Sequence, residues 1–257
     1  MSPSEQYHAF MTIARREVVR VLRIWSQTLL PPAVTMAIYF VVFGSFLGDR
    51  IRDIGGHSYI EFITPGLVMM ATITNSFSNV VGSFFSAKFQ RSIEEILISP
   101  IPDWLIVTGY AAGGVLRGLM VGALVLGIAL FFTHLPLRHP LTVAAFILLT
   151  SLVFSLAGFT NAVYAKKFDD ISIIPTFVLT PMTYFAGVFY SIDLLPPLWR
   201  SVSLFNPILY MVDGFRFGFL GSSDVDPRVG LGILALCSVG LYGVNLFLLK
   251  RGVGLRS

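Results

Sequence analysis

Charged residues are scarce in this sequence, because Asp, Glu, Lys and Arg together make up only 12% of its 257 residues. A soluble domain carries about 25% charged residues. The scarcity argues against a soluble enzyme, a nucleic-acid-binding module or a disordered linker, even though the net charge is +4. Hydrophobic residues make up 55% of the chain, and the mean hydropathy is +0.78. The composition therefore predicts an integral membrane protein without a nucleic-acid partner.

Patterns that support catalysis or metal binding are also missing. The single cysteine, Cys237, excludes an intrachain disulfide. The sequence contains no GxxxxGK[ST] phosphate-binding loop, no GxSxG and no HExxH. The histidines His8, His57, His134 and His139 lie outside the apolar runs and show no metal-ligand spacing. We therefore expect a protein that is not an enzyme and has no catalytic residue, metal or cofactor of its own.

Long apolar runs, in contrast, are abundant. A membrane-spanning helix needs about 20 mostly apolar residues. Six segments meet this requirement, and they cover residues 29–47, 62–87, 104–133, 141–165, 171–190 and 229–249. Pro65, Pro175 and Pro181 lie inside these segments and predict kinks. The sequence thus predicts an all-α integral membrane protein with six transmembrane helices in a single domain, residues 1–257.

Residues 5–25, before the first run, form an amphipathic pattern. Apolar residues recur there at i, i+3, i+4 and i+7, and Arg16, Arg20 and Arg23 fall on the opposite face. Such a helix can lie in the headgroup layer, anchored by these arginines and by Trp25. The alternative is an ordinary helix packed on the loops.

Basic residues are distributed unevenly between the two sides that six spans would create. One side carries eleven, whereas the short loops of the other side carry three. The first set is Arg15, Arg16, Arg20, Arg23, Lys88, Arg91, Lys166, Lys167, Lys250, Arg251 and Arg256, and the second is Arg50, Arg52 and Arg138. Because basic residues collect on the cytoplasmic side, both termini are predicted to be cytoplasmic.

One full charge, Arg117, lies well inside a predicted span. A cation at the centre of a transmembrane helix costs about 2.5–3.5 kcal/mol on insertion scales, and such residues usually face the bundle interior or a water-filled path. Arg117 is therefore a candidate pathway or switch residue. A structural ion pair or snorkelling toward the interface remains the alternative.

The loop after the second span, residues 88–101, predicts a short amphipathic helix. Arg91 is three and four residues from Glu94 and Glu95, which allows ion pairs on one helix face, and Pro100 stops the helix. Leu97 contributes to an apolar edge that could dock in a partner's groove. A solvated loop on the membrane surface is the alternative.

The segment before the last span, residues 191–220, is apolar and aromatic but broken by prolines. It is too short to span a membrane and predicts external re-entrant or interfacial helices. Asn206, Pro207, Asp213 and Arg216 are its candidate pathway or switch residues.

Taken together, these features resemble the membrane subunit of type-2 ATP-binding-cassette (ABC) exporters. The most specific elements are Arg91-Ser-Ile-Glu94-Glu95-Ile-Leu97-Ile-Ser-Pro100 and Phe205-Asn206-Pro207…Asp213-Gly-Phe-Arg216. The family commonly has Gly-Thr where Ser92-Ile93 stand here.

The resemblance implies a half-transporter of a bacterial cytoplasmic (inner) membrane, in which two copies form an export pathway among membrane lipids. A separate ABC ATPase would bind ATP and Mg, and Arg91–Pro100 would be the helix that couples it to the permease. The alternative is a channel or an ion-coupled secondary transporter. Ion coupling usually uses intramembrane carboxylates, and here only Glu61 and Asp103 come close to the spans.

Overall fold

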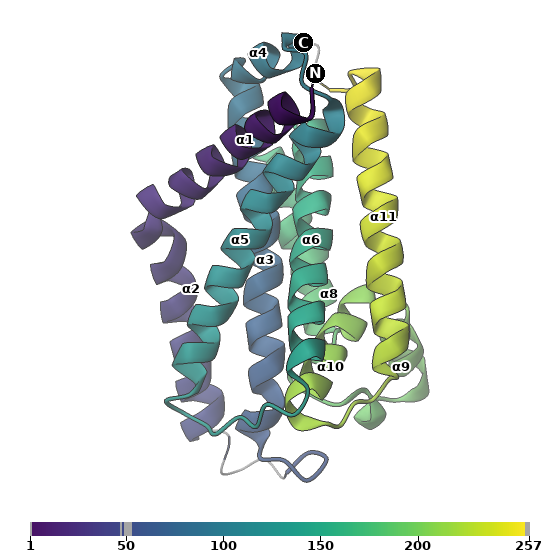
Figure 1. Ribbon diagram of the computed structural model, residues 1–257. Coiled ribbons are helices and arrows are strands. Elements are labelled where there is room, and N and C mark those ends of the chain that lie inside the picture. Colours follow the sequence, from purple (N-terminus) through teal and green to yellow (C-terminus); the bar gives the residue numbers. More distant parts are fainter. Residues whose placement is uncertain (1, 47, 49–52, 255–257) are drawn as a thin grey trace.

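The computed structural model describes residues 2–46, 48 and 53–254. Within these residues the chain folds into helices and forms no β-strand, only an isolated bridge between Ile54 and His57 (Figure 1). The prediction of an all-α protein is confirmed. Residue 47, at the end of the first predicted span, and Arg50, Arg52 and Arg256 of the basic-residue count lie outside the described residues.

Six helices are long. They are α1 (Pro3–Arg23), α2 (Trp25–Phe40), α3 (Tyr59–Phe89), α5 (Asp103–Ala129), α6 (Pro140–Tyr164) and α11 (Pro227–Arg251). The shorter α-helices are α4 (Ser92–Ile98), α7 (Asp170–Ile174), α8 (Thr180–Tyr184), α9 (Pro197–Leu204) and α10 (Pro207–Leu220). Two π-helical segments, Val41–Phe46 (η1) and Pro175–Leu179 (η3), extend α2 and join α7 to α8, and a 3-10 turn (η4) covers Ile192–Leu194.

Local sequence signals explain where several helices begin and end. The side chains of Ser2 and Glu5 cap each other's backbone N–H groups at the start of α1. The Asp226 side chain accepts a hydrogen bond from Arg228 N at the start of α11. Gly221 and Gly252 follow α10 and α11 in the left-handed conformation, which glycine adopts without steric cost.

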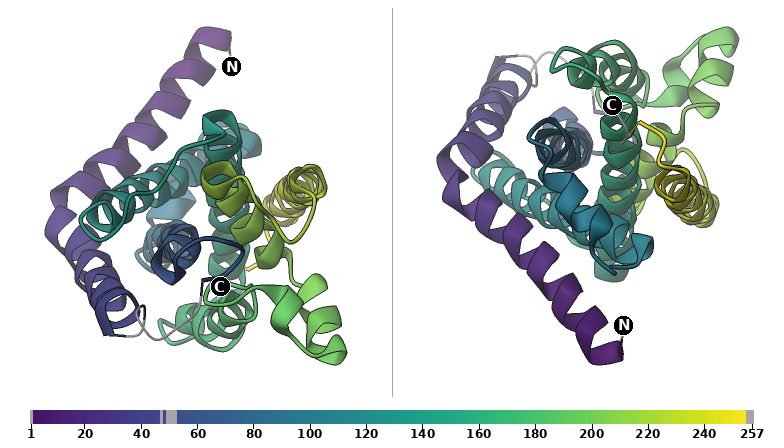
Figure 2. Two further views of the ribbon diagram at one scale, coloured as in Figure 1. Left: turned by 90° about the horizontal axis from the view of Figure 1, so that it is seen from below. Right: turned by 90° about the horizontal axis from the view of Figure 1, so that it is seen from above.

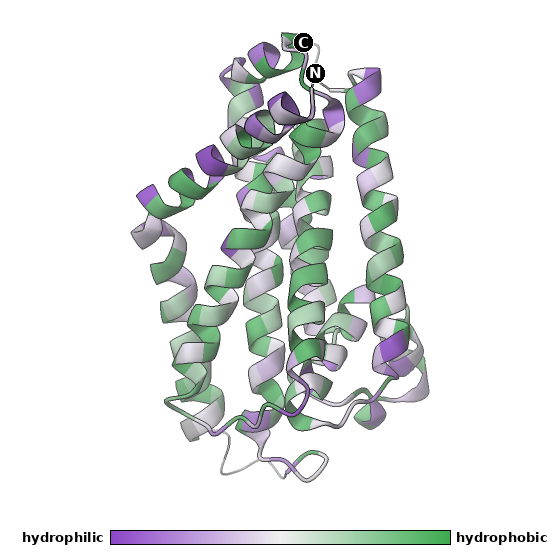
Figure 3. Cartoon of the chain, in the orientation of Figure 1, coloured by the Kyte–Doolittle hydropathy of each residue, from purple (hydrophilic) through white to green (hydrophobic). Residues whose placement is uncertain are grey.

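Four helical segments in the described part of the chain are long and apolar enough to cross a membrane: Trp25–Gly44, Asp103–Ala129, Pro140–Tyr164 and Pro227–Arg251. In Figure 3 hydrophobic residues dominate the middle of these helices, and hydrophilic residues gather toward the two ends of the molecule. Helix α3 has 31 residues but carries many polar side chains. The predicted span 171–190 is helical only as far as Tyr184; its helix changes from α to π at Pro175 and returns to α at Thr180, one residue before Pro181. Pro65, in contrast, lies inside the continuous helix α3.

Helix α3 occupies the middle of the bundle. It packs along α5 and α6 and also contacts α2 and α10, and Figure 2 shows these helices and the α7–α8 segment arranged around it. Glycines permit the close crossings, because a Cβ on Gly158 of α6 would lie 2.5 Å from the carbonyl oxygen of Phe77 in α3. Small residues bring helices together in this way in membranes, where no hydrophobic force drives association.

The two ends of the bundle differ. Both termini lie at one end together with α4, and we call this the terminal end (Figure 1). Helices α9 and α10 lie at the opposite end, which we call the distal end. Helix α1 slants across the bundle at the terminal end and packs on α5.

Candidate functional site

Helix α1 is attached to the bundle along one face. Its buried residues, Ile13, Glu17 and Val21, are spaced four apart and therefore lie on one side of the helix. A Cβ on Gly109 of α5 would lie 2.5 Å from the Ile13 side chain, and one on Gly113 would lie 2.6 Å from Glu17 Cβ. These two glycines form a notch on α5 that receives α1.

Glu17 is the centre of a polar network between α1 and α3. Its side chain is 1% exposed. Oε1 accepts a 2.6 Å hydrogen bond from Ser83 Oγ, and Oε2 lies 2.8 Å from Arg20 Nη2. The same Arg20 nitrogen donates to Asn79 Oδ1 at 2.9 Å. A buried carboxylate needs such partners, because leaving it unpaired away from water is strongly unfavourable.

The four residues predicted as interfacial anchors fall into two groups. Arg16 Nη2 donates to the Tyr110 hydroxyl at 2.5 Å, and Arg20 binds Glu17 and Asn79, so both of these guanidinium groups turn toward the bundle. Arg23 and Trp25 are exposed at the junction of α1 and α2. The sequence pattern placed all three arginines beside lipid headgroups, whereas two of them bond to α3 and α5. Their role as lipid anchors stays a prediction.

Arg117 lies on α5, where its Nη2 donates a 3.2 Å hydrogen bond to Asn75 Oδ1 of α3. Around it, four buried atoms in the described residues lack a hydrogen-bond partner: Arg117 Nε, Arg20 Nε, Asn79 Nδ2 and Ser76 Oγ. Three of these atoms can only donate. The structure gives Arg117 no acidic partner among the described residues, so the predicted alternative of a structural ion pair is not formed.

The polar side chains of α3 divide between two faces. Thr72, Ser76 and Asn79 are buried against the neighbouring helices, whereas Thr74 and Ser78 are exposed. Gly82, one turn further along, has no heavy atom within 4 Å of its Cβ position. The central helix of the bundle therefore presents a strip of small and polar residues that the described chain leaves uncovered.

Helix α4 lies within the predicted loop 88–101 but starts later than the sequence pattern suggests. Arg91 precedes it in a left-handed conformation with φ of 59°, and the helix covers Ser92–Ile98. Arg91 is therefore not on the helix face of Glu94 and Glu95, and no ion pair joins it to either glutamate in the described part of the chain. Leu97 is half-buried against the bundle, and Pro100 lies beyond the helix end.

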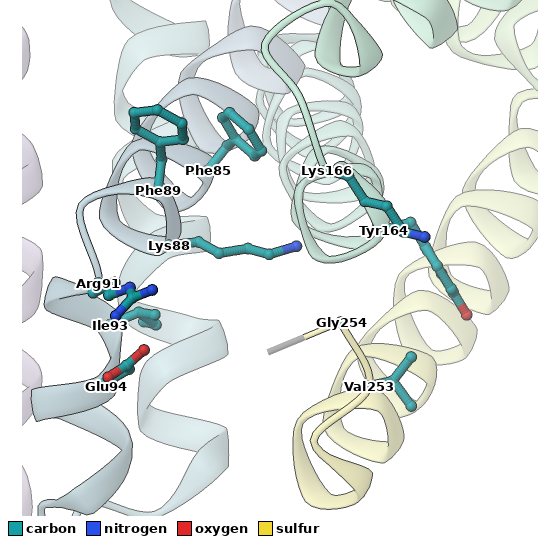
Figure 4. Close-up of a pocket in the computed structure, with 10 residues that line it drawn as sticks. All are labelled: Phe85, Lys88, Phe89, Arg91, Ile93, Glu94, Tyr164, Lys166, Val253 and Gly254. Atoms are coloured by element: carbon teal, nitrogen blue, oxygen red, sulfur yellow. The ribbon is translucent and has the colours of Figure 1, made fainter. Parts of the chain in front are cut away.

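A cavity of about 670 Å³ opens beside α4 at the terminal end. Its lining includes Lys88, Arg91, Glu94 and Lys166, together with Phe85, Phe89, Ile93, Tyr164, Val253 and Gly254 (Figure 4). The nearby turn is held by Asp170, whose carboxylate accepts hydrogen bonds from the backbone N–H groups of Lys166 and Lys167. These bonds lower the pKa of Asp170 below its usual range.

Asn206 and Pro207 begin α10. The Asn206 side chain accepts a hydrogen bond from Ile208 N, and Pro207 occupies the first turn, where a missing N–H costs nothing. Asn206 Nδ2 also donates to Met182 O of α8 at 2.6 Å. The Asn-Pro pair thus starts one helix and connects it to another.

Asp213 and Arg216 form a buried pair that holds the distal end together. The two side chains are 3.6 Å apart and are almost fully buried. Asp213 accepts hydrogen bonds from the backbone N–H groups of Asp224 and Val225. Arg216 donates to the carbonyl oxygens of Phe62 and Gly187 and stacks 3.8 Å over the Phe62 ring. The pair therefore ties α10 to α3 and to two connecting segments.

Sequence reasoning missed Glu17 and the cavity-lining lysines. Glu17 lies four residues from both Ile13 and Val21, so an acid in an otherwise apolar i, i+4 row was the available signal. Lys88 and Lys166 were counted only for topology, because nothing in the sequence shows that they face a common space.

Comparison with known proteins gives one consistent result. The family model of the ABC-2 type transporters matches residues 8–220. The chain is 53% identical over 249 residues to the "Inner membrane transport permease YadH" of Escherichia coli (strain K12). The aligned residues make up 97% of each chain. It is 27% identical over 218 residues to "Nodulation protein J" of Rhizobium leguminosarum bv. viciae, with 83% of each chain covered. It is also 26% identical over 245 residues to the protein of the same name from Rhizobium meliloti (strain 1021), and the aligned residues cover 95% of this chain and 92% of that protein.

The family match covers most of the chain, and the strongest of these relatives is similar over nearly its whole length and carries the name of a transport permease. The apolar helices agree with a multi-pass protein of the inner membrane. The chain therefore belongs to the ABC-2 type transporter family, as a membrane permease subunit of an ABC transporter.

Proposed function

We propose that this permease is a half-transporter whose export pathway forms between two copies and is driven by a separate ABC ATPase at the terminal end. Helix α4 carries the proposal. It is a short helix between α3 and α5 that is attached to the bundle through buried Ile93, while Glu94, Glu95 and Ile98 remain exposed. Ile98 is 85% exposed, and an apolar side chain so open to water favours a protein partner.

Six spans and cytoplasmic termini fit this function. The spans would be α2–η1, α3, α5, α6, residues 171–190 and α11, with α9 and α10 as re-entrant or interfacial helices on the external side. The common location of both termini supports an even number of crossings. The excess of basic residues in the segments of the terminal end supports a cytoplasmic position for that end.

The uncovered strip on α3 is the best candidate for a pathway surface. Thr74 and Ser78 are exposed on a helix that otherwise lies inside the bundle. Polar side chains facing hydrocarbon are unfavourable, so a second copy of the chain across a polar path would keep them away from lipid. Arg117 lies beside this strip through its bond to Asn75.

The alternative of an ion-coupled secondary transporter loses support from the buried acids. Glu17 lies 2.8 Å from Arg20, and Asp213 lies 3.6 Å from Arg216. Each of these carboxylates already has an arginine partner, so neither offers an unpaired acid for ion coupling.

Co-purification and export assays test the partnership with the ATPase. We expect an ABC ATPase to co-purify with the permease, and we expect the double variant Glu95→Arg/Leu97→Asp to abolish both the association and export. Asp169→Arg is the matched control, because Asp169 is an exposed acid at the same end outside α4. Normal association and export with the double variant would refute the role of α4.

Cysteine labelling tests the orientation. Because the chain has a single cysteine, Cys237→Ser gives a background in which cysteines replace Arg15 at the terminal end or Arg228 at the distal end. We expect an impermeant maleimide added to spheroplasts to label position 228 and not position 15. Labelling of position 15 alone would reverse the proposed topology.

A further inference from the structure

The cavity at the terminal end combines a basic rim with an aromatic wall, and nothing assigned to the permease so far uses this combination. Lys88, Arg91 and Lys166 line it together with a single acid, Glu94, among the described residues. Phe85, Phe89 and Tyr164 supply the aromatic part of its lining. A volume of about 670 Å³ lies within the range of small-molecule sites, about 300–1,000 Å³.

The cations are supplied by different parts of the fold. Lys88 lies in the last turn of α3, Arg91 precedes α4 and Lys166 follows α6. Figure 4 shows Lys88 reaching across the cavity toward the side on which Tyr164 and Lys166 lie, with Arg91 and Glu94 on the other side. Lys88 Nζ donates to the carbonyl oxygens of Val163 and Ala165 at 2.8 and 2.7 Å, which holds the end of α6 beside the cavity.

Two of the three cations have no side-chain acceptor among the described residues. In the described residues, neither the Arg91 guanidinium nor the Lys166 ammonium makes a hydrogen bond or an ion pair through its side chain. Both are already held near the cavity by their backbones, because Arg91 N bonds to Lys88 O and Lys166 N bonds to Asp170. An anion entering between them would gain charge-assisted hydrogen bonds without reorganising the backbone.

The aromatic part of the lining indicates which class of anion would bind. Phe89 and Tyr164 are 63% and 57% exposed. Phe85 and Phe89 also contact Phe168, with ring centroids 5.0 and 4.9 Å from that ring. A soluble anion would gain nothing from this surface, whereas an amphiphile would place its chains against it. Basic pockets between membrane helices bind anionic lipid headgroups in this way.

We propose that the cavity binds an anionic glycerophospholipid, with the phosphate between Arg91 and Lys166 and the acyl chains along Phe89 and Tyr164. The bound lipid bridges α4 to the turn that follows α6. The acidic Glu94 opposes the phosphate and weakens binding. The site is complete within one chain, so neither the ATPase nor a second copy is needed to form it.

Native mass spectrometry of the full-length permease, stripped of lipid and titrated with phosphatidylglycerol or phosphatidylcholine, tests the proposal. We expect the anionic lipid to bind at least tenfold more tightly. A cation near an anionic lipid surface is worth about fivefold in affinity. Lys166→Gln should therefore weaken phosphatidylglycerol about fivefold, and Lys166→Gln/Arg91→Gln about 25-fold, while Glu94→Gln should strengthen it.

Lys167→Gln is the matched control, because it removes the neighbouring exposed lysine, which does not line the cavity. It should bind like the unmodified protein. Unchanged thermal unfolding midpoints of all variants will show that the fold is intact. Equal affinity for the two lipids, or equal losses with Lys166→Gln and Lys167→Gln, would overturn the proposal.

Two further measurements separate the lipid from other occupants. Inorganic phosphate at millimolar concentration should not displace the lipid, and full displacement would mean that the site takes a free anion. Addition of the ATPase should leave the bound lipid in place. Its stoichiometric release on complex formation would show that the cavity is a protein-docking surface instead.

Discussion

Glu17 on the N-terminal helix and Ser83 on the central helix are joined by a 2.6 Å hydrogen bond, although 66 positions separate them in the sequence. This bond lies between two buried groups, and with the pairing of Glu17 and the partly exposed Arg20 it fixes α1 to α3. The following variants probe this attachment and the other sites of the permease.

Removing the Glu17 carboxylate should loosen α1. We expect Glu17→Ala to cost about 2–4 kcal/mol, because it leaves the Ser83 hydroxyl and a partly buried Arg20 without their acceptor. Glu17→Gln should cost less, since an amide oxygen still accepts from Ser83. Thermal unfolding in detergent measures both effects. Ser86→Ala, at a half-buried serine on the same helix, should be neutral. Equal stability of Glu17→Ala and the unmodified protein would show that the network contributes nothing.

Helix α5 contains one glycine inside the notch and one outside it, and alanine at these two positions should have opposite effects. Alanine favours a helix over glycine by about 0.8–1.0 kcal/mol. Gly127 has nothing within 4 Å of its Cβ position, so Gly127→Ala should raise the unfolding midpoint. Gly113→Ala should lower it, because the new methyl group meets Glu17 and overpacking costs about 1–3 kcal/mol. A rise in both variants would mean that α1 does not rest in the notch.

The left-handed backbone of Arg91 predicts which substitutions α4 tolerates. Glycine adopts this conformation freely, whereas a β-branched residue is strained by about 1–3 kcal/mol. Arg91→Gly should therefore leave the unfolding midpoint unchanged or higher, and Arg91→Val should lower it. Hydrogen exchange within residues 92–98 will localise the effect. Equal behaviour of the two variants would contradict a left-handed residue at this position.

The length and apolar character of α2, α5, α6 and α11 could be predicted from the sequence, because an unbroken apolar run of that length has few other stable outcomes in a membrane. The face of α1 that packs on the bundle could not be predicted from the sequence. Its stripe of apolar residues is wide enough to meet lipid and protein at once, and tertiary contacts with Gly109 and Gly113 decide which side is buried.

The roles of isolated charged residues could not be predicted from the sequence either. Asp213 and Arg216 stand out in the sequence because charge is rare, but their function as ties depends on backbone groups from residues 62, 187, 224 and 225. The start of α4 was misplaced because Arg91 has ordinary helix propensity, and only the turn from α3 forces it out of the helix.

Replacing the guanidinium group of Arg216 with a lysine ammonium group should loosen the packing of the distal end. A lysine cannot donate to Phe62 O and Gly187 O while stacking on the Phe62 ring, so Arg216→Lys should cost about 2 kcal/mol. Limited proteolysis between residues 185 and 226 should accelerate. Arg200→Lys is the control, because the Arg200–Asp193 pair is half exposed and such pairs contribute little. Similar proteolysis of the two variants would argue against the tie.

Substitutions of Arg117 should have different effects on thermal stability and on export. Its guanidinium lacks an acidic partner in the described residues, and exchange of a buried charge for an apolar side chain is often neutral or stabilising. Arg117→Met should therefore unfold at the same or a higher temperature while export falls, and Arg117→Lys should retain part of the export. Unchanged export in Arg117→Met would remove Arg117 from the pathway.

The attachment of α1 also dictates an order of events during synthesis. Its partners on α3 and α5 emerge much later, and Tyr110 follows Arg16 by 94 positions. At about 5–20 residues per second, roughly 5–20 s pass between the synthesis of Arg16 and that of Tyr110. During that time the notch for Glu17 does not yet exist, so α1 can be buried in it only after Gly109 and Gly113 of α5 have been made. The last contact made by the first helix is thus set by translation speed as well as by affinity.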